Sequence, residues 1–134
     1  MRRLLLGAIV LLSACSGGED LTAAEAQIKT FHSELNSGDF QRIYADSAQG
    51  WKNVSSSADT IQLFTGVHNK LGAFLTGTQT GWRVNYTTGG TSVIVQYASK
   101  FQKGEAQETF TFQHSGNATQ LVGYNVNSRA LITG

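Results

Sequence analysis

The residues best suited to chemistry in this chain are three histidines and one cysteine. His32, His68 and His114 lie far apart in the sequence, and Cys15 stands alone near its start. Transition metals are held by His and Cys ligands at short, recognisable spacings, which these residues do not show. We therefore expect no metal or cofactor site, and we expect each histidine to be a surface or rim residue. The sequence also has no G-x-S-x-G step and no phosphate-binding glycine loop.

The N-terminal segment has the pattern of a secretory signal peptide. Met1-Arg2-Arg3 is basic, the run from Leu4 to Leu12 is apolar, and Ser13-Ala14 is small. The apolar run is too short for a membrane span, which needs about 20 residues. We expect residues 1–14 to be removed on export.

Leu12-Ser13-Ala14-Cys15 resembles the lipobox of bacterial lipoproteins. In that family the Cys thiol receives a diacylglycerol, cleavage occurs just before the Cys, and the new N-terminus is acylated. The resemblance implies that Cys15 carries lipid, palmitate included, and anchors the protein to a membrane. Ser16 stands where an Asp implies inner-membrane retention, so the resemblance implies the periplasmic leaflet of the outer membrane. We expect residues 15–20 to be the lipidated Cys with a short tether, and residues 21–134 to be a single domain.

The mature chain is large enough for one core. Without residues 1–14 it keeps 120 residues, with eight basic and nine acidic side chains. This balance leaves no basic surface of the kind that binds nucleic acid, so we expect no such partner. With one Cys and no Pro, the fold must be held by apolar burial, and its turns must use Gly, Asn and Ser.

Three helices are expected in the first half of the domain. Thr22 to Glu25 has the form of a capping box, which predicts that the first helix begins there, and Gly38 predicts its end. A second, short helix follows Asp39 and ends near Gly50-Trp51, and a third runs from about Ala58 to Phe74. The apolar stripe of the first helix consists of Leu21, Ala24, Ile28, Phe31 and Leu35.

After Gly77 the apolar period changes to two, which predicts β-strands. Turn signals at Gly89-Gly90, Lys103-Gly104 and Ser115-Gly116-Asn117 divide this half into four strands. Such short turns predict an antiparallel meander. Helices followed by strands predict an α+β fold, with the helices covering one face of the sheet.

Three segments carry a resemblance to a known superfamily: FHSELNSGDFQRIYADSA (31–48), YASKFQKGEAQETFTF (97–112) and LVGYNV (121–126). Their order and motifs resemble the cystatin-like, cone-shaped domains of nuclear transport factor two and ketosteroid isomerase, and most closely small bacterial lipoproteins with such a domain. The resemblance covers nearly all of the mature chain and implies three helices packed on a curved four-stranded antiparallel sheet. Asn117 to Gln120 departs from the expected Gly-x-Trp turn. The superfamily includes enzymes, transport adaptors and other modules, so the resemblance implies no single function.

The resemblance also implies a place for a pocket inside the cone. Isomerases and dehydratases of the superfamily use an Asp or His base, with Tyr or acid groups that stabilise an oxyanion. Asp46 is the nearest candidate base in this chain. Because strand tyrosines usually pack the ring and expose the hydroxyl, we expect no catalytic residue and a non-enzymatic protein. The residues expected around such a pocket are Tyr44, Asp46, Trp82, Tyr86, Tyr97, Phe112 and Tyr124.

Charged residues flank the second turn of the predicted sheet. Glu105 and Glu108 lie across this turn from Lys100 and Lys103. We expect solvated ion pairs there, each contributing less than about 1 kcal/mol.

The outer face of the sheet is expected to stay wet, because Thr109, Thr111 and Gln113 alternate with phenylalanines. If Ile94 and Leu121 instead cluster on that face, a second copy could pack on it, as in the sheet-to-sheet dimers of the superfamily. A homodimer is therefore an open alternative.

Three functions remain open. The leading one is a non-enzymatic, membrane-anchored periplasmic lipoprotein that binds an envelope protein or a small apolar ligand. The first alternative is an immunity or inhibitor lipoprotein that neutralises a cell-envelope toxin through a protruding loop, for which Gly77-Thr78-Gln79-Thr80 and the Asn53 to Ser57 segment are candidates. The second is a lyase or isomerase, which requires a pocket of about 300 Å³ or more.

Overall fold

The first helix begins earlier than the sequence predicts. The computed structural model describes residues 16–133, so the predicted signal peptide and Cys15 lie outside the described residues. Helix α1 (Ser16–Ser37) includes the stretch 16–20 that was expected to be a tether. The predicted capping box is wrong, because the Thr22 hydroxyl donates to the Gly18 carbonyl oxygen (2.9 Å) inside a helix that has already begun.

The apolar stripe predicted for α1 is confirmed and faces the interior. Ala24, Ile28, Phe31 and Leu35 are each at most 4% exposed. Gly38 follows the helix at a φ of 77°, in the left-handed region that favours glycine. The predicted end of this helix is therefore confirmed.

Two short helices replace the single second helix that the sequence predicts. Helix α2 (Phe40–Asp46) and helix α3 (Gln49–Val54) are separated by Ser47 and Ala48, which have extended backbones. The Ala48 N–H donates to the carbonyl oxygen of Leu121 in the sheet (2.8 Å). A contact with a strand far along the chain thus breaks the helix, which local patterning cannot reveal.

Helix α4 (Ser57–Leu71) is shorter than predicted at its C-terminal end. The Ser56 hydroxyl caps its start by accepting a hydrogen bond from the Asp59 N–H (3.0 Å). The helix stops before Gly72, which has a φ of 74°. Phe74, predicted as the last helical residue, is instead the first residue of the sheet.

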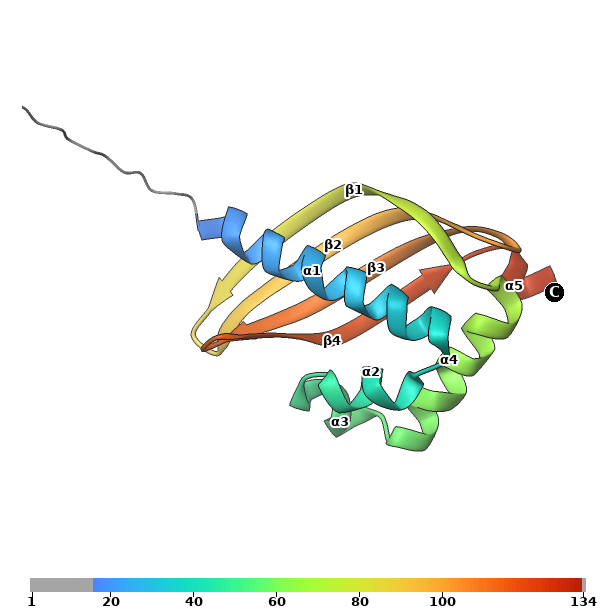
Figure 1. Cartoon of the computed structure of the whole chain (residues 1–134). Coiled ribbons are helices and arrows are strands. Elements are labelled where there is room, and N and C mark those ends of the chain that lie inside the picture. The colour runs from blue at the N-terminus through green and yellow to red at the C-terminus, as the bar shows by residue number, and fades with distance from the viewer. Residues whose placement is uncertain (1–15, 134) are drawn as a thin grey trace, which may run out of the picture.

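The second half of the chain folds into the predicted four-stranded meander. Neighbouring strands pair antiparallel in the order β1-β2-β3-β4. Register shifts interrupt the β1–β2 pairing between Gln79 and Gly81 and the β3–β4 pairing between Thr111 and Phe112. Shifts of this kind bend strands, in keeping with the curved sheet of Figure 1. The elements are β1 (Phe74–Thr87), β2 (Gly90–Phe101), β3 (Gly104–Ser115), β4 (Ala118–Asn127) and a final short helix α5 (Ala130–Thr133).

The helices pack on one face of this sheet, as the sequence predicts (Figure 1). The face under the helices is apolar, and the opposite face carries residues such as Gln96 and Asn125, which are exposed. Leu121 is only 7% exposed and belongs to the core, so it does not form an outer patch with Ile94. The outer face therefore lacks the apolar patch through which a second copy was expected to pack. The homodimer stays a prediction.

Aromatic rings dominate the interior. The Phe31 ring meets those of Phe64 and Phe110 edge-on at 5.4 and 5.2 Å between centroids. The Trp51 ring stacks on Phe64 at 6.0 Å, and its Nε1 donates to the Thr60 hydroxyl (2.9 Å). The first buried apolar residue of this cluster is Ala24, so a chain that begins at Cys15 keeps the whole core.

Candidate functional site

The most unusual polar group of the fold is Glu108, which is buried under the helices. It is 1% exposed, so the prediction of a solvated ion pair at this position is wrong. Glu108 occupies β3 on the same face as Ala106 and Phe110, and both of these are buried. Its position in the strand therefore sends a carboxylate into the core, where an unpaired charge is costly.

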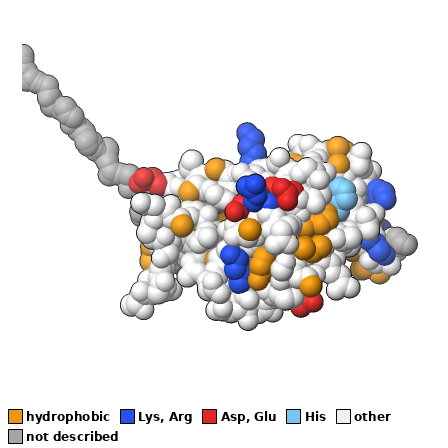
Figure 2. Space-filling model, turned by 60° about the horizontal axis from the view of Figure 1, so that its bottom comes forward, with side chains coloured by type: hydrophobic (Ala, Val, Ile, Leu, Met, Phe, Trp, Pro, Cys, Tyr) orange, Lys and Arg blue, Asp and Glu red, His pale blue; other side chains and the backbone are white. Residues whose placement is uncertain are grey.

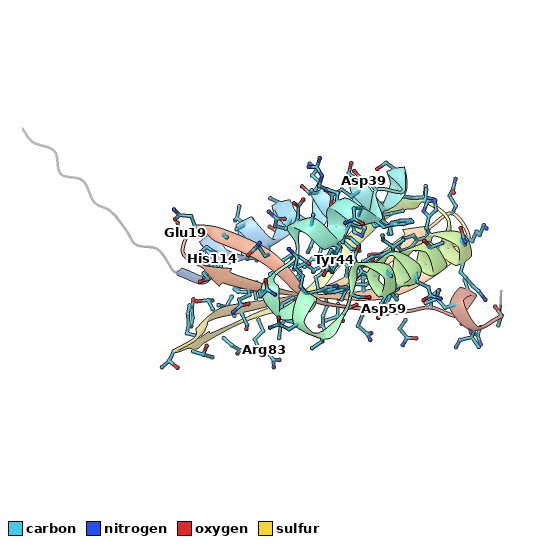
Figure 3. The ribbon with its side chains drawn as sticks, turned by 90° about the horizontal axis from the view of Figure 1, so that it is seen from below. Glu19, Asp39, Tyr44, Asp59, Arg83 and His114 are labelled. Carbon is cyan, nitrogen blue, oxygen red and sulfur yellow. The ribbon has the colours of Figure 1, made fainter. Side chains whose placement is uncertain are left out.

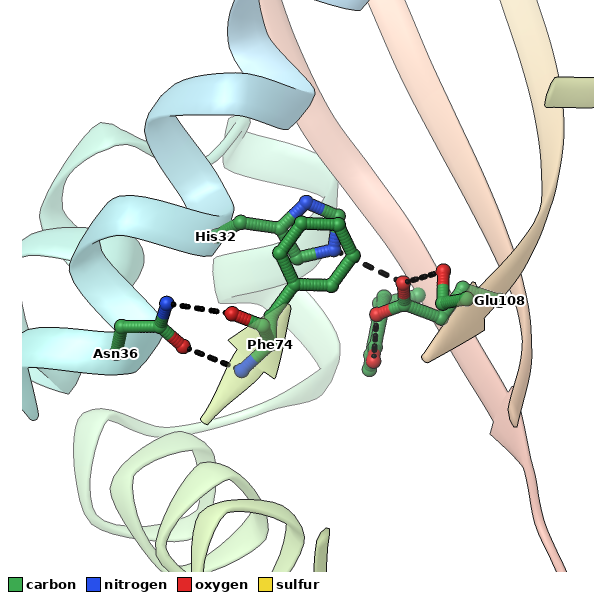
Figure 4. A network of polar contacts seen from close by, with 6 residues as sticks. His32, Asn36, Phe74 and Glu108 are labelled. Carbon is green, nitrogen blue, oxygen red and sulfur yellow. Dashed lines mark hydrogen bonds and ion pairs between the residues drawn. The ribbon is translucent and has the colours of Figure 1, made fainter. Parts of the chain in front are cut away.

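Three side chains from three elements satisfy this carboxylate (Figure 4). His32 of α1 lies with its Nε2 2.9 Å from Glu108 Oε1. The hydroxyl of Ser99 donates to the same oxygen (2.6 Å), and the Tyr124 hydroxyl donates to Oε2 (2.6 Å). An ionised carboxylate only accepts hydrogen bonds, so its neighbours in this network act as donors.

His32 is held in place by a second set of contacts. It is 5% exposed, so the expectation of a surface histidine is wrong here. Its ring stacks on that of Phe74 with 3.5 Å between centroids and 3° between planes. Asn36, one helical turn further along α1, binds the Phe74 backbone twice, through Oδ1 to the N–H (2.8 Å) and through Nδ2 to the carbonyl (3.1 Å). Figure 4 shows how this clamp fixes the start of β1 beside His32.

The network changes the acidity of the tyrosines around it. Burial raises the pKa of Tyr124 well above its ordinary value, and the neighbouring Glu108 carboxylate raises it further. Burial also raises the pKa of Tyr97, with smaller contributions from Glu25 and Glu108. Both phenols therefore remain protonated donors across the physiological pH range.

A surface groove lies beside this network, between α1 and the start of β1. Its volume is about 670 Å³, within the usual range of ligand sites. Leu75 is exposed on its β1 side. Its lining comprises Glu25, Ile28, Lys29, His32, Ser33, Asn36, Phe74, Leu75, Thr76, Gly77 and Tyr97.

The space between α1, α2 and the sheet offers far less room than this groove. Asp46, the candidate base, is exposed at the end of α2 and lines a cavity of about 20 Å³ together with Phe31 and Phe112. That volume suits about one water molecule. Glu34 lines the same cavity, where burial and then the charges of Asp46 and Asp39 raise its pKa. This arrangement leaves no room for an organic substrate beside Asp46.

The other residues expected around a pocket lie in separate places. Tyr97 lines the groove, and Tyr124 bonds to Glu108. Tyr44 is half-buried, with the Lys52 ammonium 5.6 Å from its ring centre. Trp82, well inside β1, and Tyr86, near its end, are 48% and 59% exposed, and neither lines the groove.

The remaining histidines form no common site with His32. His114 Nδ1 lies 2.7 Å from the Thr119 hydroxyl, and His68 packs near the Phe40 ring at 6.0 Å. Within residues 16–133, no group of three or more His, Cys, Asp or Glu side chains is placed to hold a metal ion.

The loops proposed for toxin binding belong largely to regular elements. Gly77 to Thr80 is part of β1, and the Asn53 to Ser57 segment divides between the end of α3 and the start of α4. Ser55 and Ser56 lie between these two helices, and Val54 beside them is 86% exposed. The inhibitor hypothesis therefore stays a prediction.

Sequence reasoning missed the cluster of His32, Ser99, Glu108 and Tyr124. One signal could have found it, since Glu108 alternates with Ala106, Phe110 and Phe112 and so belongs on the apolar face. Its partner His32 could not be predicted, because 76 positions separate the two residues.

Comparison with known proteins does not assign this chain to a family. No protein-family model matches this chain, and no curated protein matches it. Among the helices of residues 16–133, none has the length and apolar character that crossing a membrane requires.

Proposed function

We propose that this protein is a bacterial lipoprotein, anchored through Cys15 to the periplasmic leaflet of the outer membrane, that acts as a non-enzymatic binding module. The lipobox-like Leu12-Ser13-Ala14-Cys15 and the preceding apolar run support the anchor. The α+β architecture is compatible with the cone-shaped superfamily of nuclear transport factor two. On this proposal the domain works in the cell envelope and binds another envelope protein.

The observation that carries the binding proposal is the groove between α1 and β1. Its lining combines the rings of Phe74 and Tyr97 with the opposite charges of Glu25 and Lys29. Leu75 stands on its β1 side with 61% of its surface exposed. A concave surface with an apolar floor and a few polar groups is the usual form of a recognition site. The aromatic filling of the interior directs binding to this outer surface.

Site-specific photo-crosslinking tests the groove. A benzophenone amino acid at Thr76, which lines the groove, should give a discrete crosslink in intact envelopes. The Leu75→Glu substitution should remove that crosslink, because a carboxylate replaces the exposed apolar side chain. The matched control places the crosslinker at Gln62, which is exposed on α4. No discrete product from Thr76, or the same product from both positions, counts against the groove.

Palmitate labelling tests the anchor. Cys15→Ser should abolish labelling and leave the precursor unprocessed, whereas Ser16→Ala should label normally. The sorting step has its own test, since Ser16→Asp should move the labelled protein to the inner-membrane fraction. Labelling that persists in Cys15→Ser would show that the lipid is attached elsewhere.

A further inference from the structure

One end of the molecule gathers the start of α1 and two strand turns. Figure 1 shows the first turn of α1 at the same end of the sheet as the β1–β2 and β3–β4 turns. Figure 3, from another direction, shows Glu19 of α1 and His114 near the end of β3 at that same end. We name this the anchor end, comprising Ser16–Glu19, Thr87–Gly90 and Ser115–Asn117. Tyr86 adjoins it in β1, and Trp82 lies further inside the sheet, opposite Val95.

The two strand turns of the anchor end lie within two long uncharged runs of the sequence. No Asp, Glu, Lys or Arg occurs from Val84 to Ser99 or from Thr109 to Ser128. Figure 2 shows the same distribution on one face, where the end at which α1 begins is mostly white and orange beside one acidic side chain. Blue and red side chains gather over the rest of that face. Uncharged polar turns can approach lipid headgroups without the high cost of desolvating a charge.

Exposed aromatic rings add an affinity for the membrane interface. Trp82 and Tyr86 occupy the same side of β1, and about half or more of each side chain is exposed. Trp and Tyr combine an apolar ring with a polar tip and are enriched at the level of lipid headgroups. Arg83, also exposed, alternates to the opposite side of β1 and adds no charge to the side that carries the two rings.

The position of Cys15 directly before α1 determines which part of the protein lies at the membrane. Cys15 is joined directly to the first residue of a 22-residue helix, so no flexible tether separates it from the folded body. One residue reaches at most about 3.6 Å. A lipid on Cys15 therefore brings the anchor end to the bilayer itself.

We propose that the anchor end rests in the interfacial layer of the membrane that holds the protein, with β1 inclined to the bilayer so that Trp82 reaches the lipid headgroups together with Tyr86. The inference rests on the proposed attachment of lipid at Cys15. It adds a second, non-covalent membrane contact that fixes the orientation of the domain.

Tryptophan fluorescence can test this orientation, because the chain has only two tryptophans. Trp51 is 7% exposed, whereas Trp82 is 48% exposed. Residues 15–134, which keep the whole core, are coupled through Cys15 to a maleimide-bearing phospholipid in phosphatidylcholine vesicles. Lipids brominated near the headgroup should then quench the Trp82 part of the emission. Trp82→Phe should remove this quenching, because Trp51 is shielded in the core.

The control moves the lipid to another surface. Cys15→Ser combined with Gln62→Cys attaches the domain through α4, and Trp82 should then escape quenching. Equal quenching from both attachment points, or no Trp82-dependent quenching from Cys15, would overturn the proposal. So would an emission change that appears without bromine and grows with protein density, since that result indicates contact with a second copy.

The vesicle experiment separates this inference from the proposed function. Failure of palmitate labelling in cells would overturn the anchoring, whatever the vesicles show. Normal labelling without Trp82 quenching would overturn only the orientation.

Discussion

At the scale of single residues, the buried polar network depends on Glu108, whose carboxylate is the common partner of its other members. Glu108→Ala leaves the donors of His32, Ser99 and Tyr124 without their acceptor in a buried place. We expect the free energy of unfolding to fall by about 3–5 kcal/mol, as for other broken buried pairs. Urea denaturation measures this loss. The exposed Glu105→Ala serves as control and should change stability by less than about 0.5 kcal/mol. Equal losses in the two variants would contradict the network.

The raised pKa of Tyr124 predicts a loss of stability in alkali. Above its ordinary pKa of about 10 the unfolded Tyr124 loses its proton, while the folded one, buried beside a carboxylate, keeps it. The folded state then binds more protons, so the free energy of unfolding should fall by up to about 1.4 kcal/mol for each pH unit above 10.

A substitution isolates this contribution. Tyr124→Phe should lower stability at neutral pH, because it removes the hydrogen bond to Glu108. Its urea midpoint should nevertheless depend less on pH between 9 and about 11 than that of the parent chain. Tyr97, whose pKa is also raised, contributes in the same direction in both proteins. An unchanged alkaline slope in Tyr124→Phe would refute the assignment.

At the scale of single elements, the sequence pattern predicts those helix and strand features that depend on nearby residues. The stripe of α1, its end at Gly38 and the four strands follow from apolar spacing and turn residues. The break between α2 and α3 does not, because it depends on the hydrogen bond from Ala48 to Leu121 in β4. The candidate site was missed for the same reason, since its members meet only when α1 packs on the sheet.

Two helix-ending glycines give a prediction about local geometry. Gly38 has a φ of 77° with nothing within 4 Å of an added Cβ, so Gly38→Ala should cost about 1–2 kcal/mol from backbone strain alone. Gly72 combines a φ of 74° with a ψ of −162°, a region almost confined to glycine. An added Cβ there meets Gln102 Oε1 at 2.9 Å, an atom that already accepts the Ala73 N–H.

Gly72→Ala should therefore lower the free energy of unfolding by about 3 kcal/mol in total, which is more than the loss expected for Gly38→Ala. Urea denaturation of the two variants side by side measures the difference. Similar losses would mean that Gln102 moves aside without cost, and that the contact does not help to end α4.

At the scale of the whole molecule, the aromatic side chains between the helices and the sheet determine both stability and the space left for a ligand. Phe110 is fully buried and meets the rings of Phe31, Phe112 and Tyr124 within 6.2 Å. Phe110→Ala should cost about 3–5 kcal/mol and leave a cavity. Benzene should then raise the thermal midpoint of the variant but not that of the parent chain. Stabilisation of both proteins would indicate space that the packing does not show.

The two edges of the sheet bear on whether copies of this protein associate with one another. A strand with free backbone groups invites another chain to extend the sheet, and long uncharged strands favour fibril growth. Here β4 is covered where Ala48 bonds to Leu121. The opposite edge, β1, is bent by register shifts and bears the exposed Arg83. Both edges of a β-rich half with few charges are thus poorer templates for the strand of another copy.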